Sequence, residues 1–287
     1  MVYSPELKRD LKLLLDSLTF ILNAPQPESL FVLVPLTPEE LGPYEGYSNL
    51  IVLATSASAS FKVYLETFGE PKSGLSEARD KPWEGAYALG VYFPKEEALW
   101  ASLPSLIRKI RGKMKARTYE LAERLAYYAG RRGDFSKEIE ERWGVRLDVP
   151  EGWAYIKGLQ QKDFFAMAKH NPDRFFFVWR SEGPRNPTPE EVLNLRDSLT
   201  SIYYEGDYVL RNAVFAEPDT FAGYPALAVW GLWQNDKKVI GGPFKCFAFN
   251  SGGKFYLVDM AVFAPEKRRK LRYILRMESF LRKGVYP

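Results

Sequence analysis

One local pattern recurs three times and indicates where helices begin. Ser4, Thr37 and Thr188 are each followed by proline and then glutamate. A hydroxyl residue is a favoured helix N-cap, proline suits the first helical position, and glutamate in the first turn interacts favourably with the helix dipole. Glutamate also stands three residues after Thr37 and after Thr188, which is the capping-box spacing. The pattern predicts helices that begin near residues 5, 38 and 189.

The apolar residues along the chain follow two different periods. Leucines recur at helical spacing over 5–22, and similar spacing predicts helices at 95–114, 118–128, 135–143, 189–203 and 265–283. Short apolar runs between turn residues predict strands at 30–34, 49–55, 86–93, 145–149, 154–158, 175–180, 212–217, 227–234, 244–250 and 254–263. The run over 49–55 is almost unbroken, which is typical of a strand buried on both faces. This mixture predicts an α+β fold.

Two short matches occur in the same order in both halves of the chain. Residues 14–19 match 194–200 on a predicted helix, and residues 91–96 match 262–267 where a strand leads into a basic helix. We therefore expect an internal duplication, with two related helix–antiparallel-sheet–helix units and a helical insert between them. The predicted boundaries are 1–115 for the first unit, 116–187 for the insert with its connecting strands, and 188–287 for the second unit.

The composition is that of a globular protein with a substantial core. Of the 287 residues, 46% are hydrophobic and 26% are charged, and 40 basic against 36 acidic residues leave a net charge of only +4. The longest apolar run is far shorter than the roughly 20 residues that a membrane-spanning helix needs. The residues after Met1 lack a basic region followed by an apolar one, so no signal peptide is expected among them.

The residue types of common catalytic and metal sites are scarce. His170 is the only histidine and lies in a polar segment, and Cys246 is the only cysteine and lies in a predicted strand. The sequence has neither the phosphate-binding loop motif nor the dinucleotide-binding glycine motif. We therefore predict no catalytic residue, no metal and no cofactor, and we expect a protein without enzymatic activity.

Aromatic and charged residues in the second half are candidates for binding. Arg196 and Asp197 are adjacent on the predicted 189–203 helix, where Asp197 is expected to form a structural hydrogen bond or ion pair. Trp230, Trp233 and Phe244 lie on two predicted strands and are candidates for an aromatic binding surface. An acid–base role for Asp197 is the alternative.

A glycine turn separates these two strands. Gly241 and Gly242 precede a proline there, and the favoured interpretation is a requirement of backbone geometry. The alternative is that a ligand approaches the backbone closely, which makes a small-ligand or enzyme site at this turn the second functional hypothesis.

The predicted C-terminal helix is strongly basic. Long basic side chains on a solvated face explain this pattern without a function. The functional interpretation is a surface for an anionic membrane, an acidic protein or, as a third and less favoured hypothesis, nucleic acid. Its candidate residues are Arg268, Arg269, Arg272 and Arg276.

Several short motifs, taken in order, resemble one protein family. They are 25–31, 149–153, Arg196-Asp197-Ser198, Gly206, Gly231-Leu232-Trp233, 241–244 and 263–269. The chain resembles the family catalogued as domain of unknown function 4837, whose members look like bacterial cell-envelope lipoproteins. Members of this family typically carry a lipoprotein signal followed by an early strand, and we expect neither feature in this sequence.

The resemblance implies a location in the cell envelope and no particular reaction, with a cytoplasmic location as the alternative. Together with the candidate surfaces, it leads us to expect a non-enzymatic protein that binds another macromolecule of the envelope, with a protein as the expected partner.

Overall fold

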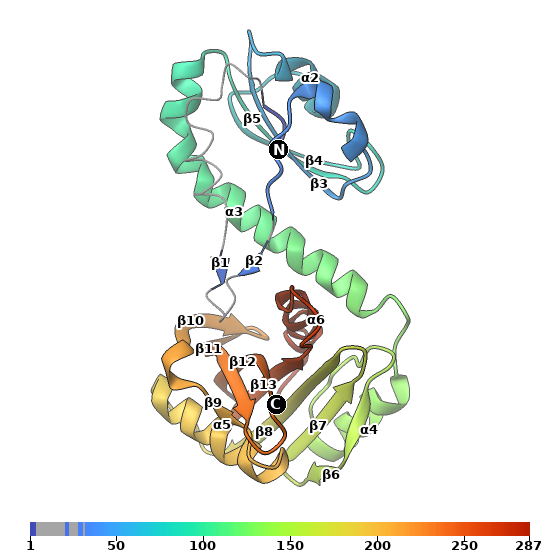
Figure 1. Cartoon of the computed structure of the whole chain (residues 1–287), viewed down its shortest axis with the longest axis vertical. Coiled ribbons are helices and arrows are strands. Elements are labelled where there is room, and N and C mark those ends of the chain that lie inside the picture. The colour runs from blue at the N-terminus through green and yellow to red at the C-terminus, as the bar shows by residue number, and fades with distance from the viewer. Residues whose placement is uncertain (4–20, 23–27, 31) are drawn as a thin grey trace. The chain divides into compact units, whose positions relative to one another are not determined.

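The structure is a computed structural model that describes residues 1–3, 21–22, 28–30 and 32–287. The chain forms two compact units, which are coloured along the sequence in Figure 1. Unit 1 comprises residues 1–21 and 29–118, and unit 2 comprises 22–28 and 119–287. Most of the helix predicted at 5–22 lies outside the described residues, and its last two residues form the short strand β1 (Ile21–Leu22) beside β2 (Glu28–Ser29).

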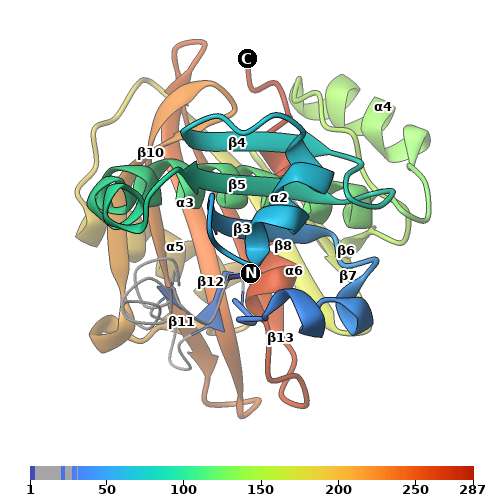
Figure 2. The ribbon, with the colours of Figure 1, turned by 90° about the horizontal axis from the view of Figure 1, so that it is seen from above.

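Unit 1 contains a three-stranded sheet with helices on its two faces. The strand order is β3 (Asn49–Thr55), β5 (Tyr87–Phe93) and β4 (Gly74–Arg79), with β3 parallel and β4 antiparallel to β5 (Figure 2). Alternate side chains of β3 pack against α2 (Ser60–Phe68) and α3 (Glu96–Ala126). The prediction that 49–55 is a strand buried on both faces is confirmed.

Two predicted elements of this region differ from the structure. The described part of 30–34 is not a strand. The helices expected at 95–114 and 118–128 are one helix, α3, because Lys115, Ala116 and Arg117 between them favour helix. The Thr37 start is confirmed as a 3₁₀ turn, η2 (Pro38–Glu40), followed by η3 (Gly42–Tyr44). The Glu40 carboxylate accepts a hydrogen bond from the Thr37 N–H at 2.8 Å.

Unit 2 contains an eight-stranded antiparallel sheet. The strand order is β10-β11-β12-β13-β8-β7-β6, with β9 (Tyr208–Val209) also paired to β11. The bounds are β6 Ala154–Gln161, β7 Phe164–Lys169, β8 Asp173–Glu182, β10 Phe215–Phe221, β11 Tyr224–Asn235, β12 Ile240–Ser251 and β13 Lys254–Phe263. Since β8 pairs with β13, the strands of segment 116–187 belong to the same sheet as those after residue 188.

The topology does not confirm the duplication. The sheet of unit 1 includes a parallel pair of strands, whereas every pairing in the sheet of unit 2 is antiparallel. Both units nevertheless have an α+β fold.

Helices cover both faces of the large sheet. α4 (Gly133–Trp143) and α6 (Leu271–Leu281) contribute to one hydrophobic core, and α5 (Pro189–Tyr203) contributes to the other. The predicted Thr188 cap of α5 is confirmed, because its hydroxyl accepts a hydrogen bond from the Glu191 N–H at 3.3 Å. Between α5 and β10, the residues Arg211–Ala213 form a 3₁₀ turn, η4.

Two further predictions in unit 2 were wrong in detail. The last helix begins at Leu271 instead of Pro265, because the chain makes a turn at 265–266, where the Lys267 N–H bonds the Ala264 carbonyl, and stays irregular up to residue 270. Residues 145–149 alternate between buried and exposed as a strand does, but their ladder is limited to one bridge between Arg146 and Val285.

Candidate functional site

Arg196 belongs to the core of unit 2. Only 1% of its surface is exposed, and its guanidinium donates to Asp259 on β13 at 2.7 and 3.4 Å. The same group lies 4.0 Å from the ring centroid of Phe244, which is also buried. Both residues therefore serve the packing between α5 and the sheet.

The neighbouring Asp197 holds α5 to the segment after it. Its carboxylate accepts hydrogen bonds from the Val209 N–H at 2.9 Å and from Arg211 at 2.7 Å. Burial raises the pKa of Asp197, and the nearby Arg211 and Arg196 charges oppose this rise. These contacts are the structural hydrogen bond and ion pair that we expected for Asp197.

Gly241 and Gly242 lie within β12, paired with Gln234 and Trp233 of β11, and not in the turn that the sequence predicted. The backbones of three strands approach closely there. A Cβ atom on Gly241 would lie 2.7 Å from the Trp233 carbonyl oxygen, and one on Gly242 would lie 1.9 Å from that of Val262. Any side chain would push β12 away from its neighbours. The contacts support the interpretation of these glycines as a requirement of backbone geometry.

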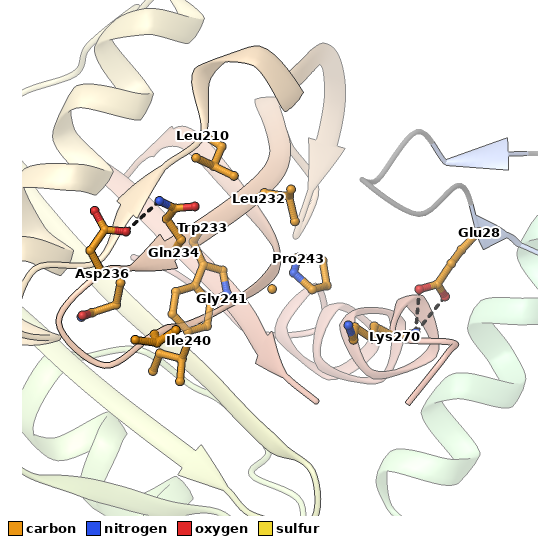
Figure 3. A pocket seen from close by; sticks show the side chains of 13 residues that line it. Glu28, Leu210, Leu232, Trp233, Gln234, Asp236, Ile240, Gly241, Pro243 and Lys270 are labelled. Atoms are coloured by element: carbon orange, nitrogen blue, oxygen red, sulfur yellow. Dashed lines mark hydrogen bonds between the residues drawn. The ribbon is translucent and has the colours of Figure 1, made fainter. Parts of the chain in front are cut away.

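A cavity of about 470 Å³ opens beside these glycines, and Figure 3 shows its lining. We call it the turn cleft, because it lies at the β11–β12 turn. Trp233 lines it although only 2% of the residue is exposed, whereas Trp230 and Phe244 do not. Its residues are Glu28, Leu210, Leu232, Trp233, Gln234, Asn235, Asp236, Val239, Ile240, Gly241, Gly242, Pro243 and Lys270.

The polar groups of the turn cleft are held in place by hydrogen bonds. Asp236 accepts from the Tyr208 hydroxyl at 3.0 Å and from the Gln234 amide at 2.9 Å. Across the cleft in Figure 3, the Glu28 carboxylate accepts from the backbone N–H groups of Lys270 and Leu271 at 2.7 to 2.9 Å. Glu28 thereby caps the N-terminus of α6, as the helix dipole favours.

The basic residues of the C-terminal segment separate into two groups. Arg268 and Arg269 precede α6 and are exposed. Arg272, which is also exposed, and the half-buried Arg276 lie on α6 and line a second cavity of about 330 Å³. We call this cavity the basic pocket. Its lining residues are Leu125, Ala126, Trp153, Lys169, Asn171, Arg174, Arg272, Tyr273, Arg276, Met277 and Phe280.

Lys169 and Arg174 are pocket residues that the sequence analysis missed. They flank the turn between β7 and β8, and nothing in their local pattern indicates that this turn faces α6. Their cationic residue type was the only available signal, and basic residues are common on surfaces.

The single histidine and cysteine lie outside both cavities. His170 is exposed and contacts Asp173 at 2.7 Å, and Cys246 is buried in β12, where burial raises the pKa of its thiol. The described residues contain no group of three or more His, Cys, Asp or Glu side chains placed to hold a metal ion. Within the same residues, no helix has the length and apolar character needed to span a bilayer.

Comparison with solved structures finds distant similarities over half of the chain. A Bacteroides thetaiotaomicron protein is 10% identical with a TM-score of 0.33, and the match covers 50% of this chain and 45% of that one. CyanoP from Synechocystis is 12% identical (TM-score 0.33; 50% and 87% covered), and Mycobacterium tuberculosis LpqN, involved in cell envelope biogenesis, is 14% identical (0.29; 49% and 81%). No curated protein matches the chain.

The family comparison agrees with the motifs noted in the sequence. The match extends over residues 133–283, which is more than half of the chain and includes all the strands of the large sheet. The chain belongs to the family described as "Domain of unknown function (DUF4837)".

Proposed function

We propose that this protein is a non-enzymatic binding protein of the cell envelope, and that it holds a segment of a partner protein in the turn cleft. The envelope location rests on the resemblance of the family to envelope lipoproteins. The single observation that carries the binding role is the turn cleft itself, a preformed cavity of about 470 Å³ among the strands that the family match covers.

The lining of the cleft suits the contacts of protein recognition. Leu210, Leu232, Ile240 and Pro243 provide an apolar surface for a partner side chain. Val239 stands at the rim and is 87% exposed, so its side chain is accessible to a partner. Apolar centres with polar edges are typical of protein interfaces.

The charges of the cleft suit a polypeptide more than a purely apolar ligand. Asp236 lies at one end of the cavity in Figure 3, and Lys270 lies at the other end beside Glu28, whose carboxylate is held by backbone N–H groups of α6. A partner segment with an apolar side chain between a basic and an acidic residue would complement both ends. Fixed charges of this kind favour one orientation of the partner.

A small ligand is the second candidate occupant. The volume lies within the range of ordinary ligand sites, and the Gln234 and Asp236 side chains supply hydrogen-bonding groups among apolar ones. If the occupant is a small ligand, the purified protein should bind a small molecule without any other protein chain. If the occupant is a partner protein, small molecules from the cell should not take its place.

The test compares two exposed aliphatic residues. Val239→Glu places a charge at the rim of the cleft, and Ile202→Glu makes the same change at a site on α5 that is 71% exposed and does not line the cleft. Tagged proteins are isolated gently from envelope fractions of the native cells. We expect a co-purifying chain that Val239→Glu reduces by about ten-fold or more and that Ile202→Glu retains.

Two results would contradict the proposal. One is equal recovery of partners by both variants, and the other is the absence of the native protein from the envelope fraction. A purified cellular small molecule that binds the wild type and not Val239→Glu would favour the second candidate.

A further inference from the structure

Four cationic side chains from three elements line the basic pocket. Lys169 ends β7, Arg174 lies near the start of β8, and Arg272 and Arg276 lie one turn apart on α6. This pocket shares no lining residue with the turn cleft, so a role for the basic pocket is independent of the proposed function.

The aromatic ring of Tyr273 organises the three guanidinium groups. Their Cζ atoms lie 4.8 Å (Arg272), 5.5 Å (Arg174) and 5.9 Å (Arg276) from its ring centroid. The Tyr273 hydroxyl also accepts a hydrogen bond from Arg272 at 2.8 Å. Contacts with a ring face stabilise a cation without neutralising its charge.

Backbone carbonyl groups fix the other side of the pocket. The Lys169 ammonium donates to the Glu151 carbonyl at 2.6 Å, and Arg174 donates to the carbonyls of Pro172 and His170 at 3.0 and 3.1 Å. Only 8% of Arg174 is exposed. These bonds position the cations, and they too leave the positive charges in place.

No carboxylate balances this charge among the described parts of the chain. None of the four cations forms an ion pair with a described Asp or Glu, and no acidic residue lines the pocket. Glu151 and Asp173 are close enough to act on Lys169 and Arg174, and Asp173 already contacts His170 at 2.7 Å. Arg174 is buried and Lys169 and Arg276 are half-buried, whereas Arg272 is exposed. Buried cations are ordinarily paired, so a cluster of cations around the buried Arg174 with no acidic partner among the described residues requires an explanation.

The cations of the pocket lower one another's pKa values, in addition to the effect of burial. Burial, followed by the charges of Arg174 and Arg276, lowers the pKa of Lys169. Burial and the charge of Arg276 lower the pKa of Arg174, while burial and Arg272 lower that of Arg276. An anion within the pocket would offset the part of these pKa shifts that the neighbouring cations cause.

We propose that the basic pocket is a binding site for a phosphate group. Each guanidinium can donate two parallel hydrogen bonds to a phosphate, and the lysine adds a further donor. A phosphate dianion with its several oxygens matches three arginines and a lysine, whereas a single carboxylate is satisfied by one arginine. The cavity of about 330 Å³ is also lined by the apolar residues Leu125, Trp153 and Met277. These residues would contact the group to which the phosphate is attached.

The test uses the full chain and two charge-removing variants, one of them a matched control. Arg272→Gln/Arg276→Gln removes two pocket cations, and Arg268→Gln/Arg269→Gln removes two exposed cations that precede α6 and do not line the pocket. Calorimetric titration with inorganic phosphate, at constant ionic strength in chloride, measures binding. We expect a saturable site that the first variant weakens by at least about ten-fold and that the control leaves within about two-fold.

A second set of titrations distinguishes the sources of the phosphate. Glycerol phosphate represents a soluble ester, and vesicles of phosphatidic acid in phosphatidylcholine represent a lipid headgroup. Loss of either interaction in Arg272→Gln/Arg276→Gln, but not in the control, supports a phosphate site and names its source.

Three results would overturn the proposal. The first is no saturable binding of phosphate, ester or vesicle beyond the effect of chloride. The second is an equal loss in the control, which would reduce the effect to general surface charge. The third is binding to a duplex oligonucleotide alone, because that would indicate a tract of phosphates on an extended surface.

Discussion

The two sides of α6 differ in how their charged side chains are balanced. On one side, Glu278 is fully buried and accepts hydrogen bonds from Lys245 at 3.0 Å and from Arg282 at 2.7 Å. On the other, Arg272 and Arg276 line the basic pocket with no carboxylate beside them among the pocket residues. Glu278 lies two residues after Arg276, which is more than half a helical turn away.

The balanced side forms a complete network. Arg282 also pairs with Asp219 at 2.6 Å, and the Tyr119 hydroxyl donates to Glu278 at 2.9 Å. Burial alone would raise the pKa of Glu278, but the charges and hydrogen bonds of Lys245 and Arg282 more than reverse this, so its pKa is lowered. Glu278 therefore stays ionised at neutral pH and binds its two cations.

This difference separates structural charge from charge that is available for a ligand. Two acids and two cations in the Glu278 network cancel, and such groups hold α6 to the sheet. The basic pocket has four cations and no acid among its lining residues. Removing a charge should therefore destabilise the fold on the first side of α6 and weaken ligand binding on the second.

The largest effect is expected from Glu278→Gln. The substitution keeps the shape of the side chain but leaves the half-buried Lys245 ammonium without a carboxylate. Breaking a buried pair in this way costs about 3–5 kcal/mol, and we expect the upper part of that range because two cations are affected. Urea unfolding measures the loss. The control Glu266→Gln breaks an exposed contact with Lys267 and should change stability by less than about 1 kcal/mol; similar losses in the two variants would contradict the comparison.

A somewhat smaller loss is expected from Asp259→Asn. Its partner Arg196 is equally buried, but the amide oxygen of asparagine retains one hydrogen bond, so we expect a loss of about 3 kcal/mol. The double variant Arg196→Met/Asp259→Leu removes both charges and should recover most of this loss, because apolar residues of similar volume replace buried pairs well. Unfolding of the three proteins in urea checks both statements, and a double variant less stable than Asp259→Asn would refute them.

The ion pairs of Glu278 and of Arg196 with Asp259 could not be predicted from the sequence. Local signals predicted the elements well: the Thr188 cap begins α5 where expected, and the unbroken apolar run is β3. Such signals depend on neighbours within a few residues. Arg196 and Asp259 are 63 residues apart, so their pairing follows from the packing of α5 on β13 and leaves no local pattern.

The same limit explains which site residues were found. Arg272 and Arg276 were visible as part of a basic segment, but the segment alone did not separate them from Arg268 and Arg269. The distinction depends on where α6 begins, and Glu28, from a distant part of the chain, caps that point. Lys169 and Arg174 join the pocket only because the β7–β8 turn lies beside α6 in the folded unit.

A small effect is expected from Arg276→Gln in chloride buffer without phosphate. Removing this cation relieves its repulsion of Arg174 and Lys169, and it breaks no ion pair with a described acidic residue. The free energy of unfolding should therefore stay within about 0.5 kcal/mol of the wild type or rise slightly. Urea unfolding again provides the measurement. A loss above about 2 kcal/mol would show that Arg276 is structural, as Glu278 is.

The smallest effect concerns the pH dependence of stability that Lys169 produces. Its pKa in the folded protein is lowered, first by burial and then by Arg174 and Arg276, with Glu151 acting in the opposite direction. The folded protein therefore binds its proton less readily than the unfolded chain, where a lysine has a pKa of about 10.4. This destabilises the folded state below the lowered pKa, and the penalty disappears as pH rises from that value to about 10.4. The stability of the wild type relative to Lys169→Gln should thus increase over that interval, as urea unfolding at several pH values would show. The same comparison in proteins that also carry Arg276→Gln should show a smaller increase in stability, because one of the cations that lower the pKa of Lys169 is gone. An unchanged increase would mean that burial alone sets the pKa of Lys169 and that the cations of the basic pocket do not act on one another.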